Sequence, residues 1–269
     1  MSFRLLQCLG VKNPCYKRYN GINLVPEGIV VHTTDANNKR ISRYDEPASG
    51  QTSGLSDNGE TVSASKMSAI LGDNLNNNSW NRSGATAAVH AFIGTTANGS
   101  IAVCQFLPWQ SPCWGSGSGP KGTVNGCYNG KAQSPLYVQF EICEGPHSDL
   151  DYCRKTYQTA VEFCAYLIKM FPTIKPEKIF GHKEIYEQGK SAVRADPIKY
   201  WTACKSGYTM DGFRRDVKAA LKAPETATGS DIYRVQVGAF HNKAYAENYL
   251  ATVQKVFPGA YLKKEKSND

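Results

Sequence analysis

The chain has 269 residues, of which 41% are apolar, 20% charged and 11% aromatic. This apolar content is enough for a buried core and excludes a wholly disordered chain, and no apolar run approaches the ~20 residues of a membrane helix. Lysine and arginine outnumber acidic residues by 31 to 23, a formal charge of +8 that favours anionic partners. The basic residues are scattered, so neither nucleic acid nor a membrane is expected as a partner.

Strands and helices are predicted to alternate along the chain. The predicted strands are 28–32, 87–94, 101–107, 137–143 and 178–182, and the predicted helices are 61–71, 151–171 and 211–221. The segments 35–60, 73–84 and 115–135 are rich in small and polar residues, which predicts long loops. The alternation predicts an α/β fold, with a mixed central sheet flanked by helices and a small C-terminal βαβ-like tail.

A change in composition predicts two parts joined by a linker. Residues 224–231 are small and polar and include Pro and Gly, which is typical of linkers. We therefore expect a body at 1–223 and a tail at 232–269, and the tail is below the usual size for independent folding.

The nine cysteines are irregularly spaced and contain no CxxC pair, which argues against a structural zinc knuckle. Cys143 and Cys164 lie within apolar patterns and are expected to be small core residues. The first residues lack the features of a secretory signal peptide, so we expect synthesis in the cytoplasm with reduced thiols.

Three of the five histidines, His32, His90 and His182, end or interrupt predicted strands. A histidine at a strand end is more often a satisfied polar group than a metal ligand. His32, His182 and Asp196 would nevertheless meet the requirement of a catalytic zinc, which has three protein ligands and one open position. From spacing alone the metal site is the less favoured of these two interpretations.

Ten short motifs in a fixed order resemble a known family. They are VHTT at 31–34, ANN at 36–38, VHAFIG at 89–94, GSI at 99–101, LPW at 107–109, FEICE at 140–144, GHKE at 181–184, RADP at 194–197, YW at 200–201 and MDGFR at 210–214. Together they cover most of the body. The ordered set resembles the zinc-dependent N-acetylmuramoyl-L-alanine amidases of the type-2 amidase, peptidoglycan-recognition-like family, in its phage endolysin branch.

The resemblance implies a zinc ion and a role for each matched residue. His32 and His182 match two zinc ligands, and Asp196 takes the third ligand position. Glu141 matches the general base, with Glu144 as the alternative if Glu141 points away.

Two matched positions depart from the common pattern. Arg194 stands where relatives usually carry lysine or histidine, so it is expected to stabilise an oxyanion by its charge without donating a proton. Gly115 stands where relatives commonly carry histidine after a tryptophan, which leaves Trp114 as a candidate substrate contact. Asn38 and His90 are further candidate contacts, and for His90 a core position is the alternative.

The tail carries a second resemblance. The run YRVQVGAF at 233–240 is similar to the sporulation-related repeat that binds peptidoglycan glycan strands, and implies wall contacts by Tyr233, Gln236 and Phe240. A strand at 233–237, a helix at 243–257 and a strand at 260–262 would form one half of that domain. Because half a repeat leaves sheet edges uncovered, we expect pairing in a homodimer or docking on the body.

The resemblance implies a peptidoglycan hydrolase that cleaves the amide bond between N-acetylmuramic acid and L-alanine with zinc-activated water. Such an enzyme would act at the bacterial cell wall after release from the cell, with anionic wall polymers as further partners. Two alternatives remain open: a peptidoglycan-binding module without catalysis, and a wall hydrolase with a cysteine–histidine pair.

Overall fold

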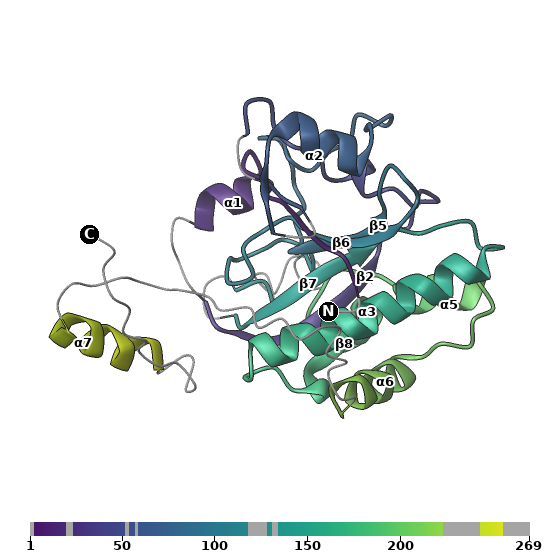
Figure 1. The fold of residues 1–269 in the computed structure, drawn as a ribbon. Coiled ribbons are helices and arrows are strands. Elements are labelled where there is room, and N and C mark those ends of the chain that lie inside the picture. The colour runs from purple at the N-terminus through teal and green to yellow at the C-terminus, as the bar shows by residue number, and fades with distance from the viewer. Residues whose placement is uncertain are drawn as a thin grey trace. The chain divides into compact units, whose positions relative to one another are not determined.

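A computed structural model describes residues 3–19, 24–51, 54–56, 59–117, 128–130, 134–222 and 243–254. The chain divides into two compact units, Met1–Ala223 and Pro224–Asp269. In the second unit the described residues form the helix α7 (Lys243–Gln254), which lies within the predicted helix at 243–257 (Figure 1). The predicted linker, both predicted tail strands and the expected wall contacts Tyr233, Gln236 and Phe240 lie outside the described residues.

Among its described residues, the first unit forms one mixed sheet. Its strands are β1 (Leu5–Cys8), β2 (Pro26–Thr33), β3 (Gly54–Leu55), β4 (Thr61–Val62), β5 (Ala91–Thr95), β6 (Ile101–Gln105), β7 (Leu136–Ile142) and β8 (Ile179–Gly181). The order across the sheet is β4-β3-β1-β6-β5-β7-β2-β8. Strands β5, β7, β2 and β8 are mutually parallel, whereas β6 runs antiparallel to β5. The predicted mixed α/β fold is confirmed.

Helices cover both faces of this sheet. They are α1 (Pro14–Tyr19), α2 (Ala64–Leu71), α3 (Leu150–Met170), α4 (His182–Glu187), α5 (Ile198–Ala203) and α6 (Met210–Lys222). Helix α3 begins where the Asp149 side chain accepts a hydrogen bond from Tyr152 N at 3.0 Å. It ends before Pro172, which cannot continue a helix. In Figure 1, α3 and α6 lie on one side of the sheet and α2 lies on the other.

The two faces of the sheet have separate apolar cores. Val31 of β2 and Phe140 of β7 pack with Phe163 of α3 and Phe213 of α6 on the first face. The opposite face carries a second cluster, in which Phe92 packs with residues that include Met67 and Leu71 of α2. Next to that cluster, polar side chains of β2 and β7 project from the same face, and the candidate site is built there.

The element boundaries differ from the predictions where side chains interrupt a pattern. The predicted helix at 61–71 divides into β4 and α2, because Ser63 caps α2 by accepting a hydrogen bond from Lys66 N. The strand predicted at 87–94 starts only at Ala91. His182, expected to end a strand, begins α4. The sequence patterns do not predict β1, β3, α1, α4 or α5, and β3 lies within the predicted loop at 35–60.

All eight described cysteines are free thiols and buried: Cys8, Cys15, Cys104, Cys113, Cys143, Cys153, Cys164 and Cys204. Cys143 and Cys164 are fully buried core residues, as the apolar pattern predicts. Of the helices in the described part of the chain, none has the length and apolarity to cross a bilayer.

A buried carboxyl group lies among these thiols. Asp45 follows the short 3-10 helix η1 (Ile41–Arg43) and is 0% exposed. Cys104 donates its thiol to Asp45 Oδ2 at 3.3 Å. Burial raises the pKa of Asp45 to about 8, although the hydrogen bonds from Cys104 and Cys8 oppose this rise. The folded chain therefore keeps Asp45 protonated at neutral pH.

We expect Asp45 to make the free energy of unfolding fall as the pH rises from about 4 to about 8. Between these values the folded chain holds a proton that the unfolded chain has released. Because Asp45→Asn cannot titrate, its stability should fall less than that of the wild type, by on the order of 2 kcal/mol between pH 5 and pH 7. Urea unfolding followed by tryptophan fluorescence measures this, since all the tryptophans lie in the first unit. Equal pH slopes for the two proteins would contradict a neutral Asp45.

Candidate metal centre

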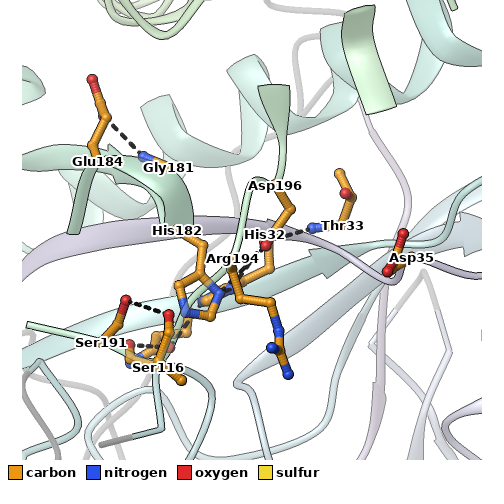
Figure 2. A network of polar contacts seen from close by, with 12 residues as sticks. His32, Thr33, Asp35, Ser116, Gly181, His182, Glu184, Ser191, Arg194 and Asp196 are labelled. Atoms are coloured by element: carbon orange, nitrogen blue, oxygen red, sulfur yellow. Dashed lines mark hydrogen bonds and ion pairs between the residues drawn. The ribbon is translucent and has the colours of Figure 1, made fainter. Parts of the chain in front are cut away.

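Two imidazoles and a carboxylate converge at one end of the sheet (Figure 2). His32 Nδ1 lies 2.9 Å from His182 Nδ1 and 3.4 Å from Asp196 Oδ2. His182 Nδ1 lies 3.5 Å from Asp196 Oδ1. All three residues are buried, and each offers a ligand atom within 4.8 Å of the others.

The pairing of β2 with β8 brings the two histidines together. The strands are parallel, and Val31 of β2 lies opposite Gly181 of β8. His32 directly follows Val31, and His182 directly follows Gly181. Both histidines therefore leave the same end of neighbouring strands. A Cβ on Gly181 would lie 2.8 Å from Pro197 Cδ, so glycine allows the Asp196 loop to approach β8.

Backbone hydrogen bonds hold Asp196 in place. Its carbonyl accepts from Lys183 N at 2.9 Å, which ties the loop to α4. Its Oδ2 accepts from Thr33 N at 3.3 Å, which ties the side chain to the end of β2 (Figure 2). Asp196 is thus fixed to both elements that carry the histidines.

Burial and mutual charge shift the pKa of each member of this group. Burial alone would raise the pKa of Asp196, but the hydrogen bonds and charges of the two imidazoles lower it. Burial opposes protonation of His32, yet the neighbouring Asp196 and Glu141 raise its pKa. Burial and the charge of His32 lower the pKa of His182. These shifts favour an ionised Asp196 beside the two imidazoles.

The donor set fits a zinc ion. Zinc binds imidazole nitrogen and carboxylate oxygen at about 2.0–2.2 Å, so tetrahedral ligand atoms stand about 3.3 Å apart. The two Nδ1 atoms are 2.9 Å apart, and each lies within 3.5 Å of a different oxygen of Asp196; one ligand atom from each residue lies within 4.8 Å of the others. His182 directs Nδ1 toward His32 and Asp196. Its other ring nitrogen, Nε2, is buried and has no hydrogen-bond partner among the described residues. Two imidazoles and one carboxylate would leave a fourth position open.

Glu141 lies beside this group on the neighbouring strand. It is opposite His32 in the β2–β7 pairing, so both side chains project from the same face. Its Oε2 is buried without a hydrogen-bond partner among the described residues. Burial raises the pKa of Glu141 to about 8; the charges of His32 and Arg194 oppose this rise, and those of Asp196 and Glu144 add to it.

Glu144 is already engaged in holding the backbone. Its Oε1 accepts from Asp35 N at 3.1 Å, and its own N–H donates to Thr34 Oγ1 at 3.1 Å. These bonds join the end of β7 to the loop after β2. Glu144 thus already has a backbone partner, whereas Glu141 Oε2 has none among the described residues.

Arg194 is exposed and lies close to the metal group (Figure 2). Its Nη1 donates to Val193 O at 2.8 Å, and its positive charge lowers the pKa of His182 and of Glu141. It can thus present a positive charge at the solvent side of the group.

The three expected substrate contacts lie in different surroundings. The Arg18 guanidinium lies 4.5 Å from the ring centre of Trp114, which is partly buried. Asn38 Nδ2 donates to Asn76 Oδ1 at 3.2 Å in the loop after β2. His90 is fully buried, and both of its ring nitrogens are hydrogen-bonded to main-chain groups. The structure therefore favours the core alternative for His90.

One residue of the site was missed by the motif comparison. Gln139 on β7 is fully buried, and its Oε1 lies 3.0 Å from His32 Nε2. The signal in the sequence is a polar residue two positions before Glu141 in an otherwise apolar strand, which places both on one face.

Among known proteins, similarity to this chain was found only with solved structures. No protein-family model matches the chain, and no curated protein matches its sequence. The Staphylococcus aureus hydrolase AmiA in complex with its ligand shares 19% identity over 81% of this chain and 83% of that chain, with a TM-score of 0.49. The PlyG catalytic domain shares 16% identity over 83% of this chain and 99% of that chain, with a TM-score of 0.44. A mutant endolysin from Bacillus subtilis shares 15% identity over 80% of this chain and 99% of that chain, with a TM-score of 0.45. At these values the function of this chain is inferred from its own side chains.

We expect alanine at His32, His182 or Asp196 to lower zinc affinity by about 100-fold or more, since even a partner behind a ligand is worth 10–100-fold. Equilibrium dialysis with elemental analysis of zinc measures this. His147→Ala is the control, because it removes an exposed imidazole outside the group. Unchanged affinity in all three ligand variants would show that zinc, if bound, lies elsewhere.

Proposed function

We propose that this chain is a zinc-dependent N-acetylmuramoyl-L-alanine amidase. It would cleave the amide bond between the lactyl group of N-acetylmuramic acid and the first L-alanine of the stem peptide. The observation that carries the proposal is the buried group of His32, His182 and Asp196 with Glu141 beside it. The ordered motifs that resemble type-2 amidases support the choice of substrate.

In this mechanism the chain holds the metal and controls one proton. His32, His182 and Asp196 are the ligands; bound zinc supplies a Lewis acid and lowers the pKa of a water molecule. Glu141 would stay a carboxylate because the charge of a bound zinc ion would oppose the rise in pKa that burial causes, and it would take the proton from the attacking water and return it to the leaving amine. Its Oε2, which is buried and has no hydrogen-bond partner among the described residues, supports this role.

Arg194 contributes charge during the same reaction. Attack on the amide carbonyl places negative charge on its oxygen, and a nearby guanidinium stabilises that charge. Because arginine keeps its proton at any practical pH, Arg194 acts by electrostatics alone.

The proposed substrate is the peptidoglycan of the bacterial cell wall. The formal charge of +8 would also attract anionic wall polymers. We propose that residues 232–269, which resemble half of a sporulation-related repeat, bind the wall and pair with a second copy of the chain.

Two alternatives have less support. A binding module without catalysis has no need of a complete set of three ligands beside a buried carboxylate. A thiol hydrolase needs an accessible thiolate, but the eight described cysteines are buried, and burial raises the pKa of Cys143 and Cys164 well above its usual value.

Identification of the new chain ends after digestion of purified peptidoglycan tests the proposal. We expect free L-alanine amino groups to appear, and we expect a chelator to stop the reaction and added zinc to restore it. Labelling of amino groups followed by mass spectrometry identifies them. Reducing sugar ends would indicate a glycosidase, and digestion that survives metal removal would contradict the zinc mechanism.

Replacement of Glu141 distinguishes the role of a general base from that of a zinc ligand. We expect Glu141→Gln to lower kcat by about 10²–10⁴-fold while zinc content is unchanged, because general-base catalysis has this magnitude. Glu144→Gln is the matched control, since its amide oxygen can still accept from Asp35 N. A larger loss in Glu144→Gln than in Glu141→Gln would reverse the assignment.

A further inference from the structure

Behind the candidate metal centre lies a fully buried polar cluster. Gln139 Oε1 lies 3.0 Å from His32 Nε2 and accepts from Ser116 Oγ at 2.9 Å. Gln139 Nε2 donates to Tyr128 O at 3.2 Å and to Asn129 Oδ1 at 2.8 Å. The side-chain amide of Gln139 is therefore held from both ends.

Chemistry alone fixes which way this amide points. Tyr128 O is a main-chain carbonyl, which can only accept a hydrogen bond. Asn129 Nδ2 donates to Gly117 O at 3.1 Å, so Asn129 Oδ1 is also an acceptor. Both partners require the NH₂ group of Gln139, and the oxygen of Gln139 must then face His32 and Ser116.

The amide orientation determines the tautomer of His32. An amide oxygen can only accept, so His32 Nε2 must carry the hydrogen in this contact. In the neutral ring the lone pair then lies on Nδ1, the atom that faces His182 and Asp196. A histidine that binds a metal through Nδ1 needs this tautomer.

The backbone of Gln139 is fixed as firmly as its side chain. Gln139 N donates to His90 Nδ1 at 3.0 Å, and His90 N donates to Gln139 O at 2.7 Å. His90 Nε2 donates to Ser111 O at 2.9 Å. Burial lowers the pKa of His90 to about 4, although these backbone hydrogen bonds oppose the shift, so the ring stays neutral and keeps its acceptor nitrogen.

Gly115 provides the space that this amide occupies. A Cβ at position 115 would lie 2.4 Å from Gln139 Oε1 and 2.9 Å from Val89 Cγ1. Even alanine at this position would displace the oxygen that faces His32.

We propose that Gln139 is the positioning residue of the metal centre, because its amide oxygen fixes His32 as the tautomer with Nδ1 free for the metal. This inference rests on the proposed zinc site and deepens it. Gln139 is not one of the three candidate ligands, and it would act through its contact with His32.

Zinc affinity of full-length variants, measured by competition with a chromophoric chelator, tests the proposal. We expect Gln139→Leu to lower affinity by about 10–100-fold, the usual effect of losing the partner behind a ligand. Gly115→Ala should lower it in the same direction. Tryptophan fluorescence verifies that each variant is folded.

Two variants separate positioning from general support of the fold. Gln139→Glu keeps an oxygen toward His32 Nε2 but loses the NH₂ group that Tyr128 O and Asn129 Oδ1 require, so its zinc affinity should fall, though by less than that of Gln139→Leu. Gln105→Leu is the matched control, because Gln105 is also buried, lies on β6, and bonds through its amide to Gln7 and Leu107 O. The zinc affinity of Gln105→Leu should stay within about threefold of the wild type.

A direct measurement follows the Nε2 hydrogen of His32 by ¹⁵N-resolved NMR. The wild type should show a slowly exchanging imidazole NH that Gln139→Leu lacks. Wild-type affinity in Gln139→Leu, or an equal loss in Gln139→Glu, would overturn the proposal. Failure of the wild type to bind zinc would overturn the metal centre itself, and the NMR signal would show separately whether the tautomer assignment holds.

Discussion

Seven paired positions hold β2 and β7 side by side, from Pro26 opposite Leu136 to Thr33 opposite Ile142. Side chains alternate between the faces of a sheet, so this register places His32, Glu141 and Gln139 on one face. The other face of the same strands carries Val31 and Phe140 into the core beneath α3. A slip of one residue would exchange the two sets and bury the imidazole among apolar side chains. The apolar core on one face thus fixes the position of the polar group on the other.

The polar group is stable because its members compensate one another. A buried carboxylate is costly unless it is paired and hydrogen-bonded, and Asp196 has two imidazoles and the Thr33 N–H around it. The pKa of His32 is raised and that of His182 is lowered, the pattern of two rings that share one proton beside a carboxylate. The lone pairs that hold this proton are those a divalent cation would use, so metal binding would release protons.

The sequence predicts the long elements well, because their side-chain periodicity reports burial directly. Helix α3, predicted at 151–171, spans Leu150–Met170, and β7, predicted at 137–143, spans Leu136–Ile142. Periodicity fails for short elements such as β1, whose four residues gain their place from pairing with β6. The order of strands in the sheet also cannot be predicted from side-chain periodicity, because the neighbours β2 and β7 are separated by more than 100 residues of chain.

The candidate site, too, is only partly predictable from the sequence. His32, His182, Asp196 and Glu141 follow from motifs, and the structure brings the first three together and sets Glu141 opposite His32. Gln139 does not follow from a motif, because its side chain contacts His32, which lies 107 positions earlier, and also Ser116, Tyr128 and Asn129. No local pattern reveals that a glycine at 115 leaves room for it.

The buried thiols have a consequence for following the motions of this fold. Alkylating reagents attack only a thiolate that solvent can reach, so each described cysteine does not react until the structure around it opens. The cysteines are spread over β1, α1, β6 and α3, the ends of β7 and α5, and, for Cys113, the segment that follows β6. Their labelling rates would rank these elements by the free energy of local opening, without any residue being introduced for the purpose.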